Sequence, residues 1–437
     1  MILRNVRRFR PFPADSVRAA VRAFMDGENR ENRDDLFLLL RLGGELNRPA
    51  SISDSEQLEE EMKKEEMRAE MPNPRTDVWS IVPGLVLLPE RLHEGCLHLL
   101  AREGCIEGVK MLFSFGVYLD LRDSRGRTAL MNASSNGHTE VLEFLLQAGA
   151  ETEGVDKEGV SALILAAWNG HAAAVRALLS GSALVDAVSR AGLTALMGAC
   201  IKGYVDVVNV LVEADASVEK KDWSDKTALM YACLRASVKG GGEIVQVLVK
   251  AQADVNAVSR NRKAVVMFAC EGSHCEALQL LIEGGANVDS ADGDGMTALM
   301  LASWSGHGRI VKVLIEARAN VNAAARFGMT PLMHAARMGG ADVVEMLLQG
   351  GANVDAVESA GRTALMQACM YRHLETVKVL LSAGADTRIV SRSGDTALAC
   401  AGQRPHCFGG GMSSSASSTE EVVSFLQTFL KKQGDLE

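Results

Sequence analysis

Apolar residues along most of the chain recur in short segments at helical spacing, and turns separate the segments. In one segment the apolar positions are Val141, Leu142, Leu145 and Leu146, and an equivalent segment holds Val343, Val344, Leu347 and Leu348. This spacing places the apolar side chains on a single face of a helix. The pattern predicts an all-α chain of short amphipathic helices that follow one another in pairs.

A four-residue phrase marks the beginning of each pair. Thr-Ala-Leu-Met recurs in exact or edited form, with its first residue at Thr128, Ser161, Thr194, Thr227, Ala264, Thr297, Thr330, Thr363 and Thr396. Every interval is 33 residues except the one that ends at Ala264, which is 37. The same frame extends back to Gly95. Self-similarity at a fixed period is the signature of a repeat architecture, so we expect ten units from about Arg91 to the C-terminus.

Each unit has the same internal order. A turn that contains Asp or Ser and a glycine opens it, as in Asp123–Gly126, and a Gly-His break such as Gly137-His138 separates its two helices. A Gly-Ala pair such as Gly149-Ala150 closes it, with the glycine as a left-handed helix cap. The unit is therefore a turn, a helix, a loop and a second helix.

This unit resembles the ankyrin repeat family, which has Thr-Pro-Leu-His where this chain has Thr330-Pro-Leu-Met333. The resemblance covers about 345 of the 437 residues. The histidine of the family phrase is kept only as His98, and methionine replaces it at positions 131, 197, 230, 267, 300, 333 and 366. The resemblance implies an ankyrin-repeat solenoid whose turn tips and first helices line a concave groove that grips other proteins.

Two units depart from the pattern. The unit that begins near Asp222 carries four extra residues within Ala236–Gly242, and the last unit inserts a Gly/Ser-rich loop at Phe408–Ser418. Inserts in solenoids fall in loops and are either binding elements or neutral drift. We expect the last unit to be a C-terminal cap whose helix begins after an N-cap at Thr419.

The chain divides into an N-terminal helical and charged-linker segment, 1–90, and the repeat array, 91–437. Residues 1–25 are rich in arginine, which fits an ordinary basic helix or an organellar transit peptide. Residues 16–47 are a degenerate repeat or unrelated to the array, and both interpretations stay open. The acidic stretch 54–70 is a charged linker or a coiled-coil partner helix.

Composition narrows the class of protein. Lys and Arg number 46 against 55 Asp and Glu, which leaves a net charge of −9 and a pI near 5.6. This balance argues against a nucleic-acid binder. No apolar stretch approaches the roughly 18 residues that cross a bilayer, so we expect no membrane span. Nine scattered cysteines suggest a reducing compartment. We expect the cytoplasm or nucleus, with an organelle as the alternative if residues 1–25 are a transit peptide.

The sequence predicts no catalytic residue, no cofactor and no metal site. Five histidines share the break before the second helix and are expected to be scaffold residues: His138, His171, His274, His307 and His373. Four cysteines share a first-helix slot with small residues and are expected to pack there: Cys200, Cys233, Cys270 and Cys369. Neighbouring slots are about 10 Å apart, too far for thiolates to share one zinc ion.

Candidate partner-binding residues occupy the turn tips and the exposed ends of the first helices. The tips contribute Arg190, Trp223, Arg260, Arg326 and Arg392. The first helices contribute Trp168, Lys202, Trp304, Arg337, Met338, Met370 and Tyr371. Trp, Tyr and Arg are the residue types most enriched at interface hot spots. Acidic residues at the alternate tips, Glu158, Asp225, Asp294 and Glu358, allow a second interpretation, in which each arginine pairs with the neighbouring tip.

The expected function is that of a non-enzymatic scaffold, a monomeric array that binds one or more unidentified partner proteins through its concave face. The alternative is an adaptor or regulatory subunit that recruits a substrate to a catalytic partner.

Overall fold

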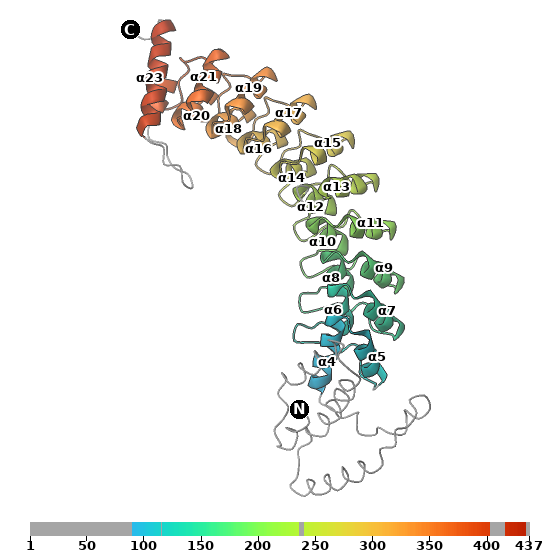
Figure 1. Ribbon diagram of the computed structural model, residues 1–437. Coiled ribbons are helices and arrows are strands. Elements are labelled where there is room, and N and C mark those ends of the chain that lie inside the picture. Colours follow the sequence, from blue (N-terminus) through green and yellow to red (C-terminus); the bar gives the residue numbers. More distant parts are fainter. Residues whose placement is uncertain (1–89, 115, 236–239, 403–415, 434–437) are drawn as a thin grey trace, which may run out of the picture. The chain divides into compact units, whose positions relative to one another are not determined.

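The computed structural model describes residues 90–114, 116–235, 240–402 and 416–433, and this part of the chain forms two compact units that divide after Arg190. It contains twenty α-helices and one 3-10 turn, with isolated β-bridges in place of strands (Figure 1). The all-α fold is therefore confirmed.

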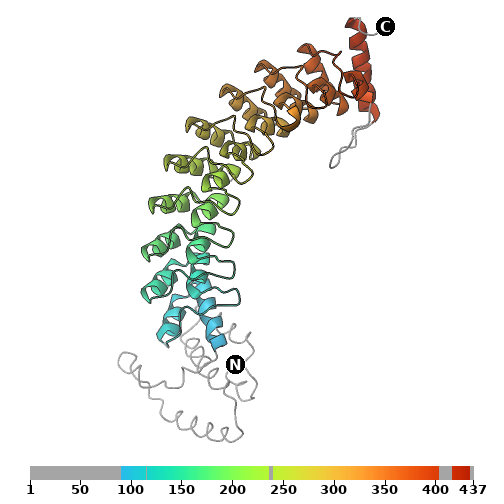
Figure 2. The ribbon, with the colours of Figure 1, turned by 180° about the vertical axis from the view of Figure 1, so that it is seen from behind.

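Unit 1 holds three helix pairs. They are α4 (Glu90–Glu103) with α5 (Ile106–Ser114), α6 (Ala129–Asn136) with α7 (Thr139–Gln147), and α8 (Ala162–Trp168) with α9 (Ala172–Ser180). The first helices of successive pairs contact one another, and so do the second helices. Each unit thus has a row of first helices and a row of second helices, which Figure 2 shows from behind.

Unit 2 continues the same pairing. Its first helices are α10 (Ala195–Lys202), α12 (Ala228–Leu234), α14 (Val265–Glu271), α16 (Ala298–Ser305), α18 (Pro331–Met338), α20 (Ala364–Met370) and α22 (Ala397–Gly402). Its second helices are α11 (Val205–Glu213), α13 (Gly241–Lys250), α15 (Cys275–Glu283), α17 (Gly308–Glu316), α19 (Ala341–Gln349), α21 (Leu374–Ser382) and α23 (Ala416–Gln433).

The first helices begin where a hydroxyl side chain caps them. Thr128 Oγ1 accepts a hydrogen bond from the Met131 backbone N–H at 3.3 Å, and the equivalent Thr or Ser does the same in seven further first helices. This bond satisfies an N–H that has no partner within the helix. At α14 the cap is Ala264, and no side-chain hydrogen bond forms there.

The core lies between the two rows of helices and consists of the repeated Leu, Met and Val side chains. The methionines that replace the family histidine are 0 to 1% exposed wherever they occur. The first-helix slot of the four cysteines is buried in every case, as it is where the slot holds Ser134, Ala167, Ser303 or Ala336. The predicted role of these cysteines in packing is confirmed.

The histidine that precedes a second helix links its own helix pair to the preceding helix pair. His138 Nε2 lies 2.8 Å from the Arg102 carbonyl, and His373 Nε2 lies 3.0 Å from the Arg337 carbonyl. The ring occupies the space beside a glycine of the preceding pair. A Cβ on Gly339, whose φ is +80°, would lie 2.5 Å from His373 Nδ1. The scaffold role that the sequence predicts for these two histidines is confirmed.

The turns before the first helices project as fingers, defined here as the segments between one second helix and the next first helix. Neighbouring fingers are joined by backbone hydrogen bonds: Lys157 N–H donates to Arg125 O in unit 1, and Arg326 N–H donates to Asp294 O in unit 2. An acidic side chain closes most fingers internally, as when Asp156 Oδ1 accepts from two backbone N–H groups at 2.9 Å. The finger tips are thereby held in fixed positions within each unit.

Several expectations fall at the limits of the described residues. The N-terminal segment 1–89, the extra residues 236–239 and most of the Gly/Ser loop lie outside them. The predicted N-cap at Thr419 is wrong, because α23 already begins at Ala416. Ser418 and Ser417 are compatible with a first helical turn, so the helix extends into the end of the loop.

Candidate functional site

The first-helix face, which we define as the finger tips together with the C-terminal ends of the first helices, carries the exposed apolar surface of unit 2. Among the described residues of that unit, the large apolar side chains that are exposed are Trp223, Val258, Trp304, Phe327, Met338, Val357 and Val390. All of them lie on fingers or at first-helix ends, and none lies on a second helix. Exposed apolar side chains that gather on one face mark interaction sites.

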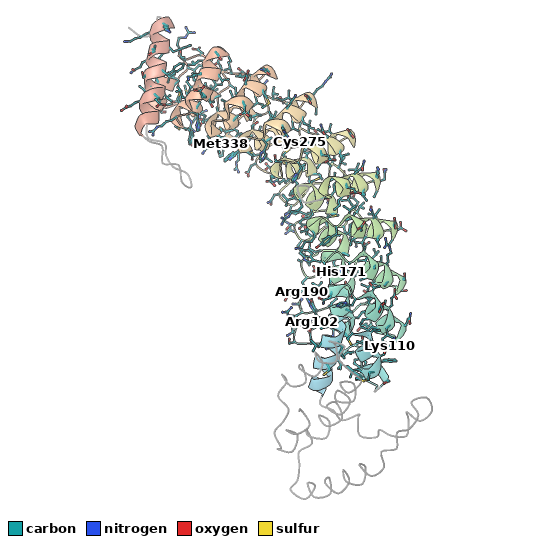
Figure 3. All side chains as sticks on the ribbon, viewed as in Figure 1. Arg102, Lys110, His171, Arg190, Cys275 and Met338 are labelled. Atoms are coloured by element: carbon teal, nitrogen blue, oxygen red, sulfur yellow. The ribbon has the colours of Figure 1, made fainter. Side chains whose placement is uncertain are left out.

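Unit 1 shows the same distribution with one exception. Among its described residues, four of the five exposed large apolar side chains lie on fingers: Tyr118, Val155, Leu184 and Val188. Trp168 ends α8 and is half-buried, while Arg190 is an exposed finger residue whose backbone N–H donates to Glu158 O at 3.0 Å. Phe113 on the second helix α5 is also exposed. Figure 3 labels Arg190 on the finger side of this unit and Lys110 on the second-helix side. The apolar concentration on the first-helix face is therefore shared by the two units, and it is without exception only among the described residues of unit 2.

The alternating charged tips are only partly paired with one another. Arg260 Nε lies 3.4 Å from Asp225 Oδ2, and Arg326 Nη1 lies 3.5 Å from Asp294 Oδ1, both at exposed positions. Within the described residues, Arg190 and Arg392 form no ion pair with a neighbouring tip. Surface pairs of this kind contribute little to stability.

Glu358 behaves differently from the pairing that the sequence suggested. It is buried and accepts from Arg362 Nε of its own finger at 2.7 Å, so it does not pair with a neighbouring tip. Desolvation by burial opposes ionisation, but the hydrogen bonds from Arg362 and from the Ala360 N–H lower the pKa of Glu358 overall. This ion pair belongs to the scaffold of the finger.

Three predicted residues from successive first helices meet in unit 2. The Arg337 guanidinium carbon is 5.7 Å from the centroid of the Trp304 ring and 5.2 Å from that of Tyr371. Trp304 is 41% exposed, while Arg337 and Tyr371 are half-buried. We call these three residues the arginine–aromatic cluster. Met338, the next residue on α18, is 45% exposed.

A buried histidine lies beneath this cluster. The His334 ring is 5.3 Å from the Trp304 ring, is 4% exposed, and has no hydrogen-bond partner at either nitrogen. Desolvation, assisted by the charge of Arg337, lowers the pKa of His334 to about 4. The sequence did not single out this residue. The signal that could have identified it is the residue type at this repeat position, where the other units hold Leu99, Asn132, Leu165, Gly198, Tyr231, Phe268, Leu301, Gln367 or Cys400.

A second cationic cluster lies on α12 and α14. Lys226 Nζ is 5.5 Å from the Tyr231 ring and 5.7 Å from the Phe268 ring, and Lys263 also lies over Phe268. Tyr231 Oη donates to Asp222 Oδ2 at 2.5 Å. Burial, and then this hydrogen bond, raise the pKa of Tyr231. Lys263 pairs with Glu271, so the charges of this cluster are largely compensated.

The remaining predicted residues are dispersed on the same face. Lys202 is exposed at the end of α10, and Trp223 is 64% exposed on its finger. Met370 is half-buried, with its sulfur 3.9 Å from Arg362 Nη1. Phe327 is the most exposed of the large apolar side chains, at 67%, and has a φ of +68°. Phe327 was not among the predicted residues. From that finger tip the sequence analysis selected only its neighbour Arg326.

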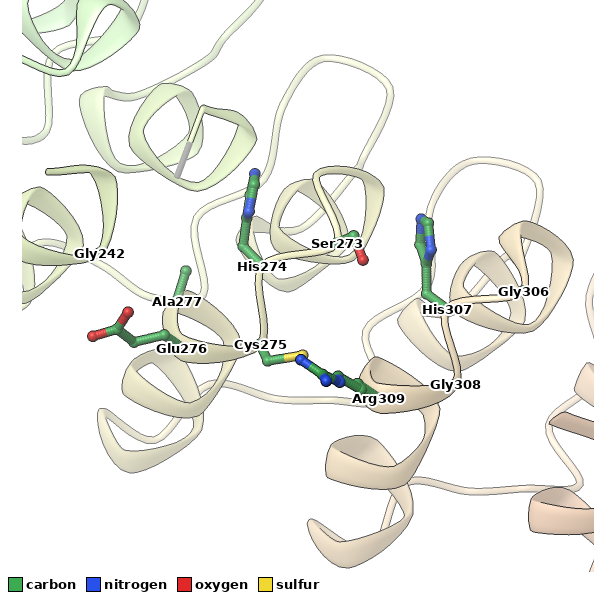
Figure 4. A pocket seen from close by; sticks show the side chains of 10 residues that line it. All are labelled: Gly242, Ser273, His274, Cys275, Glu276, Ala277, Gly306, His307, Gly308 and Arg309. Carbon is green, nitrogen blue, oxygen red and sulfur yellow. The ribbon is translucent and has the colours of Figure 1, made fainter. Parts of the chain in front are cut away.

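A solvent-open pocket of about 500 Å³ lies on the opposite side of the helix pairs, where α15 and α17 begin (Figure 4). Its lining includes His274, Cys275, Glu276, His307 and Arg309. His274 is hydrogen-bonded to the Leu234 carbonyl, and desolvation lowers its pKa. Because that bond fixes the ring as part of the scaffold, His274 is not positioned as a base for Cys275.

Among the described residues, no three His, Cys, Asp or Glu side chains gather closely enough to hold a metal ion. None of the described helices combines the length and the apolarity that a membrane crossing requires.

Comparison with known families decides the assignment of the repeat. A family model described as "Ankyrin repeats (3 copies)" matches residues 97–188, 181–259, 234–325, 320–391 and 354–406, which together span most of the array. The chain belongs to the ankyrin repeat family. Ankyrin repeats are protein–protein interaction modules and are typically non-catalytic, so partner proteins are the class of ligand that the fold implies. A search among curated proteins finds no significant match to the chain.

Proposed function

We propose that this ankyrin repeat protein is a non-enzymatic scaffold that binds a partner protein through its first-helix face, the concave face that the family resemblance implies. The proposal includes ten repeats, one for each described helix pair. It takes the predicted tip and first-helix residues as the contact set, with the strongest contribution from unit 2.

One observation carries the proposal: every exposed large apolar side chain among the described residues of unit 2 lies on fingers or first-helix ends. The second helices have an equally long solvent-facing side, but it is polar, with residues such as Lys312 and Glu345. Packing does not require this asymmetry, because the core is already complete between the two rows of helices.

Phe327 adds support from strain. A bulky residue with positive φ is an outlier that costs about 1–3 kcal/mol, and such residues cluster at functional sites. Here the strained backbone presents an aromatic ring to solvent at a finger tip. A ring in this position adds nothing to the core, so its benefit is expected in a complex.

The test is affinity capture from the source cell's lysate with three forms of the full-length chain. We expect the W304A/M338A double variant to lose the partner that the unmodified chain retains. The matched control, K312A/E345A, changes two exposed second-helix residues and is expected to retain it. If only the control variant lost the partner, or if both variants retained it, the interface would lie elsewhere.

The alternative function, an adaptor that recruits a substrate to a catalytic partner, stays a prediction. It relies on docking by residues 1–90, nearly all of which lie outside the described part of the chain. Capture with a chain that lacks residues 1–89 separates the two, since an adaptor would lose a catalytic partner and keep its substrate.

A further inference from the structure

Arg337 is held in place by its neighbours at the end of α18. Its guanidinium lies over the rings of Trp304 and Tyr371, from the preceding and following first helices. Its backbone carbonyl accepts a hydrogen bond from His373 Nε2 at 3.0 Å. A guanidinium that packs its faces against aromatic rings keeps its N–H donors along its planar edge. The side chain is therefore oriented before any ligand arrives.

The charge of Arg337 is not compensated within the described residues. Arg260, Arg326 and Arg362 each have a carboxylate within 3.5 Å, whereas no carboxylate lies within ion-pair distance of Arg337. Arg260 and Arg326 pair with acids of neighbouring fingers, and Arg362 pairs within its own finger, so the charges of these three are already matched. Arg337 alone among these four has an aromatic setting and no acidic partner.

Among the described residues, the buried His334 ring beneath the arginine–aromatic cluster is a second polar group without a partner at this site. His334 is 4% exposed, and neither ring nitrogen has a hydrogen-bond partner. Desolvation, and then the charge of Arg337, lower the pKa of this ring to about 4, so the ring is neutral at neutral pH. Arg337 is therefore the positive charge of the site, and a bound anion would compensate it.

The rim of the cluster is apolar. Trp304 and Met338 are 41% and 45% exposed, and both flank Arg337. A ligand that satisfied the arginine alone would leave this surface uncovered. The combination fits a peptide that carries a carboxylate side chain next to a large apolar one, since aromatic and arginine anchors dominate such interfaces.

We propose that the arginine–aromatic cluster binds an acidic segment of the partner protein, with an Asp or Glu carboxylate on Arg337 and an adjacent apolar side chain on Trp304 and Met338. This inference rests on the proposed function and names the chemistry of the partner. The net charge of −9 makes a nucleic acid the less favourable source of an anion.

The test is selection of a displayed library of random 12-residue peptides on the full-length chain and, separately, on its R337Q variant. We expect the peptides selected only by the unmodified chain to be enriched in Asp or Glu next to Leu, Trp or Phe. Fluorescence anisotropy with the best such peptide should show binding at least about tenfold weaker for R337Q, as a lost charge-assisted pair predicts. Glu→Gln in the peptide should have the same effect.

Matched variants exclude simpler causes. R309Q removes an exposed arginine of the second helix α17, which lies outside the proposed contact set, and should bind within about twofold of the unmodified chain. R337K keeps the charge but loses the planar donor edge, so it should bind more weakly than the unmodified chain. Thermal unfolding of each variant shows whether the fold is retained.

Three results would overturn the inference: no acidic enrichment, equal selection by both forms, or tighter binding of a 20-nucleotide single-stranded DNA that R337Q abolishes. The proposed function would still stand if W304A/M338A lost the cellular partner while R337Q kept it. If neither variant lost the partner, the proposed function itself would fail.

Discussion

At the scale of single residues, the threonine that begins each first helix is the most repeated device in the chain. Its hydroxyl accepts from the N–H three residues later at 3.2 to 3.5 Å in the helices that have it. Ala264 has nearly the same backbone angles, with φ −78° and ψ 158°, but no side chain to accept. One first helix of unit 2 thus lacks a side-chain cap, and its Met267 N–H donates instead to the Ala264 carbonyl at 3.0 Å.

We expect A264T to raise the free energy of unfolding by about 1 kcal/mol, the usual contribution of an N-cap. Six of the equivalent threonines are at most 6% exposed and fit the same site, so the added atoms have room. T297A is the converse control and should lower stability by a similar amount. Urea denaturation followed by circular dichroism measures both, and an A264T chain no more stable than the original would contradict the capping account.

His334 predicts a pH dependence. Its pKa is lowered from 6.5 to about 4 in the folded chain by desolvation and then by Arg337. Below pH 6.5 the unfolded chain therefore binds a proton that the folded chain does not, and stability falls as the pH is lowered toward 4.

The H334L variant isolates this effect, because Leu165 and Leu301 occupy the same repeat position. Between pH 7.5 and 5.0 the unmodified chain should lose about 2 kcal/mol more stability than H334L. His274 and His373 titrate in both forms and cancel in the comparison. Equal losses in urea denaturation at the two pH values would show that His334 is not the source.

At the scale of elements, the junction between a first helix and the next pair depends on a glycine and a histidine together. Gly339 has a φ of +80°, and a Cβ there would meet the His373 ring. Gly306 has a φ of +70° but faces open space, because Gly340 replaces the histidine of the following pair. The two glycines share a conformation and differ in their neighbour.

We expect G306A to cost about 1 kcal/mol, the strain of a left-handed alanine. G339A should cost about 1 kcal/mol more, since it also displaces the ring that bonds to the Arg337 carbonyl. Denaturation of the two variants side by side measures the difference. Equal costs would mean that the histidine contributes nothing to the junction.

The finger that carries Phe327 allows stability and binding to be separated. Glycine relieves positive φ without a steric cost, so F327G should raise the free energy of unfolding by about 1 kcal/mol. Because the exposed ring is lost, capture of the partner should weaken. A variant that was stabilised and bound normally would remove Phe327 from the interface.

The sequence predicted the helix pairs, the buried cysteine slot and the scaffold role of the histidines at the breaks, because each follows from a local pattern that recurs in register. The capping by the repeat threonines was not predicted and became visible only in the hydrogen bonds of the structure. The sequence analysis missed the extension of α23 to Ala416, since Thr419 satisfies the same capping rule in isolation. It also missed that Glu358 pairs within its own finger, because alternation along the sequence does not show which side chains are buried. Phe327 became a candidate only because its side chain is exposed in the structure, and His334 only because its side chain is buried there.

At the scale of the whole molecule, the two units share exposed apolar fingers but differ in their aromatic and arginine residues. The exposed tryptophans Trp223 and Trp304 and the arginine–aromatic cluster lie in unit 2, whereas Trp168 of unit 1 is half-buried. We therefore expect the residues of unit 2 to carry most of the affinity. Trp168 and Arg190 of unit 1 should then contribute less than Trp304 and Arg337.

The measurement that tests the central claim most directly is site-specific photo-crosslinking in the source cell's lysate. A p-benzoylphenylalanine placed at Met338 on the first-helix face should crosslink to the captured partner. The same group at Glu345, an exposed residue of α19, should not. Crosslinking from position 345 without crosslinking from position 338 would contradict the account.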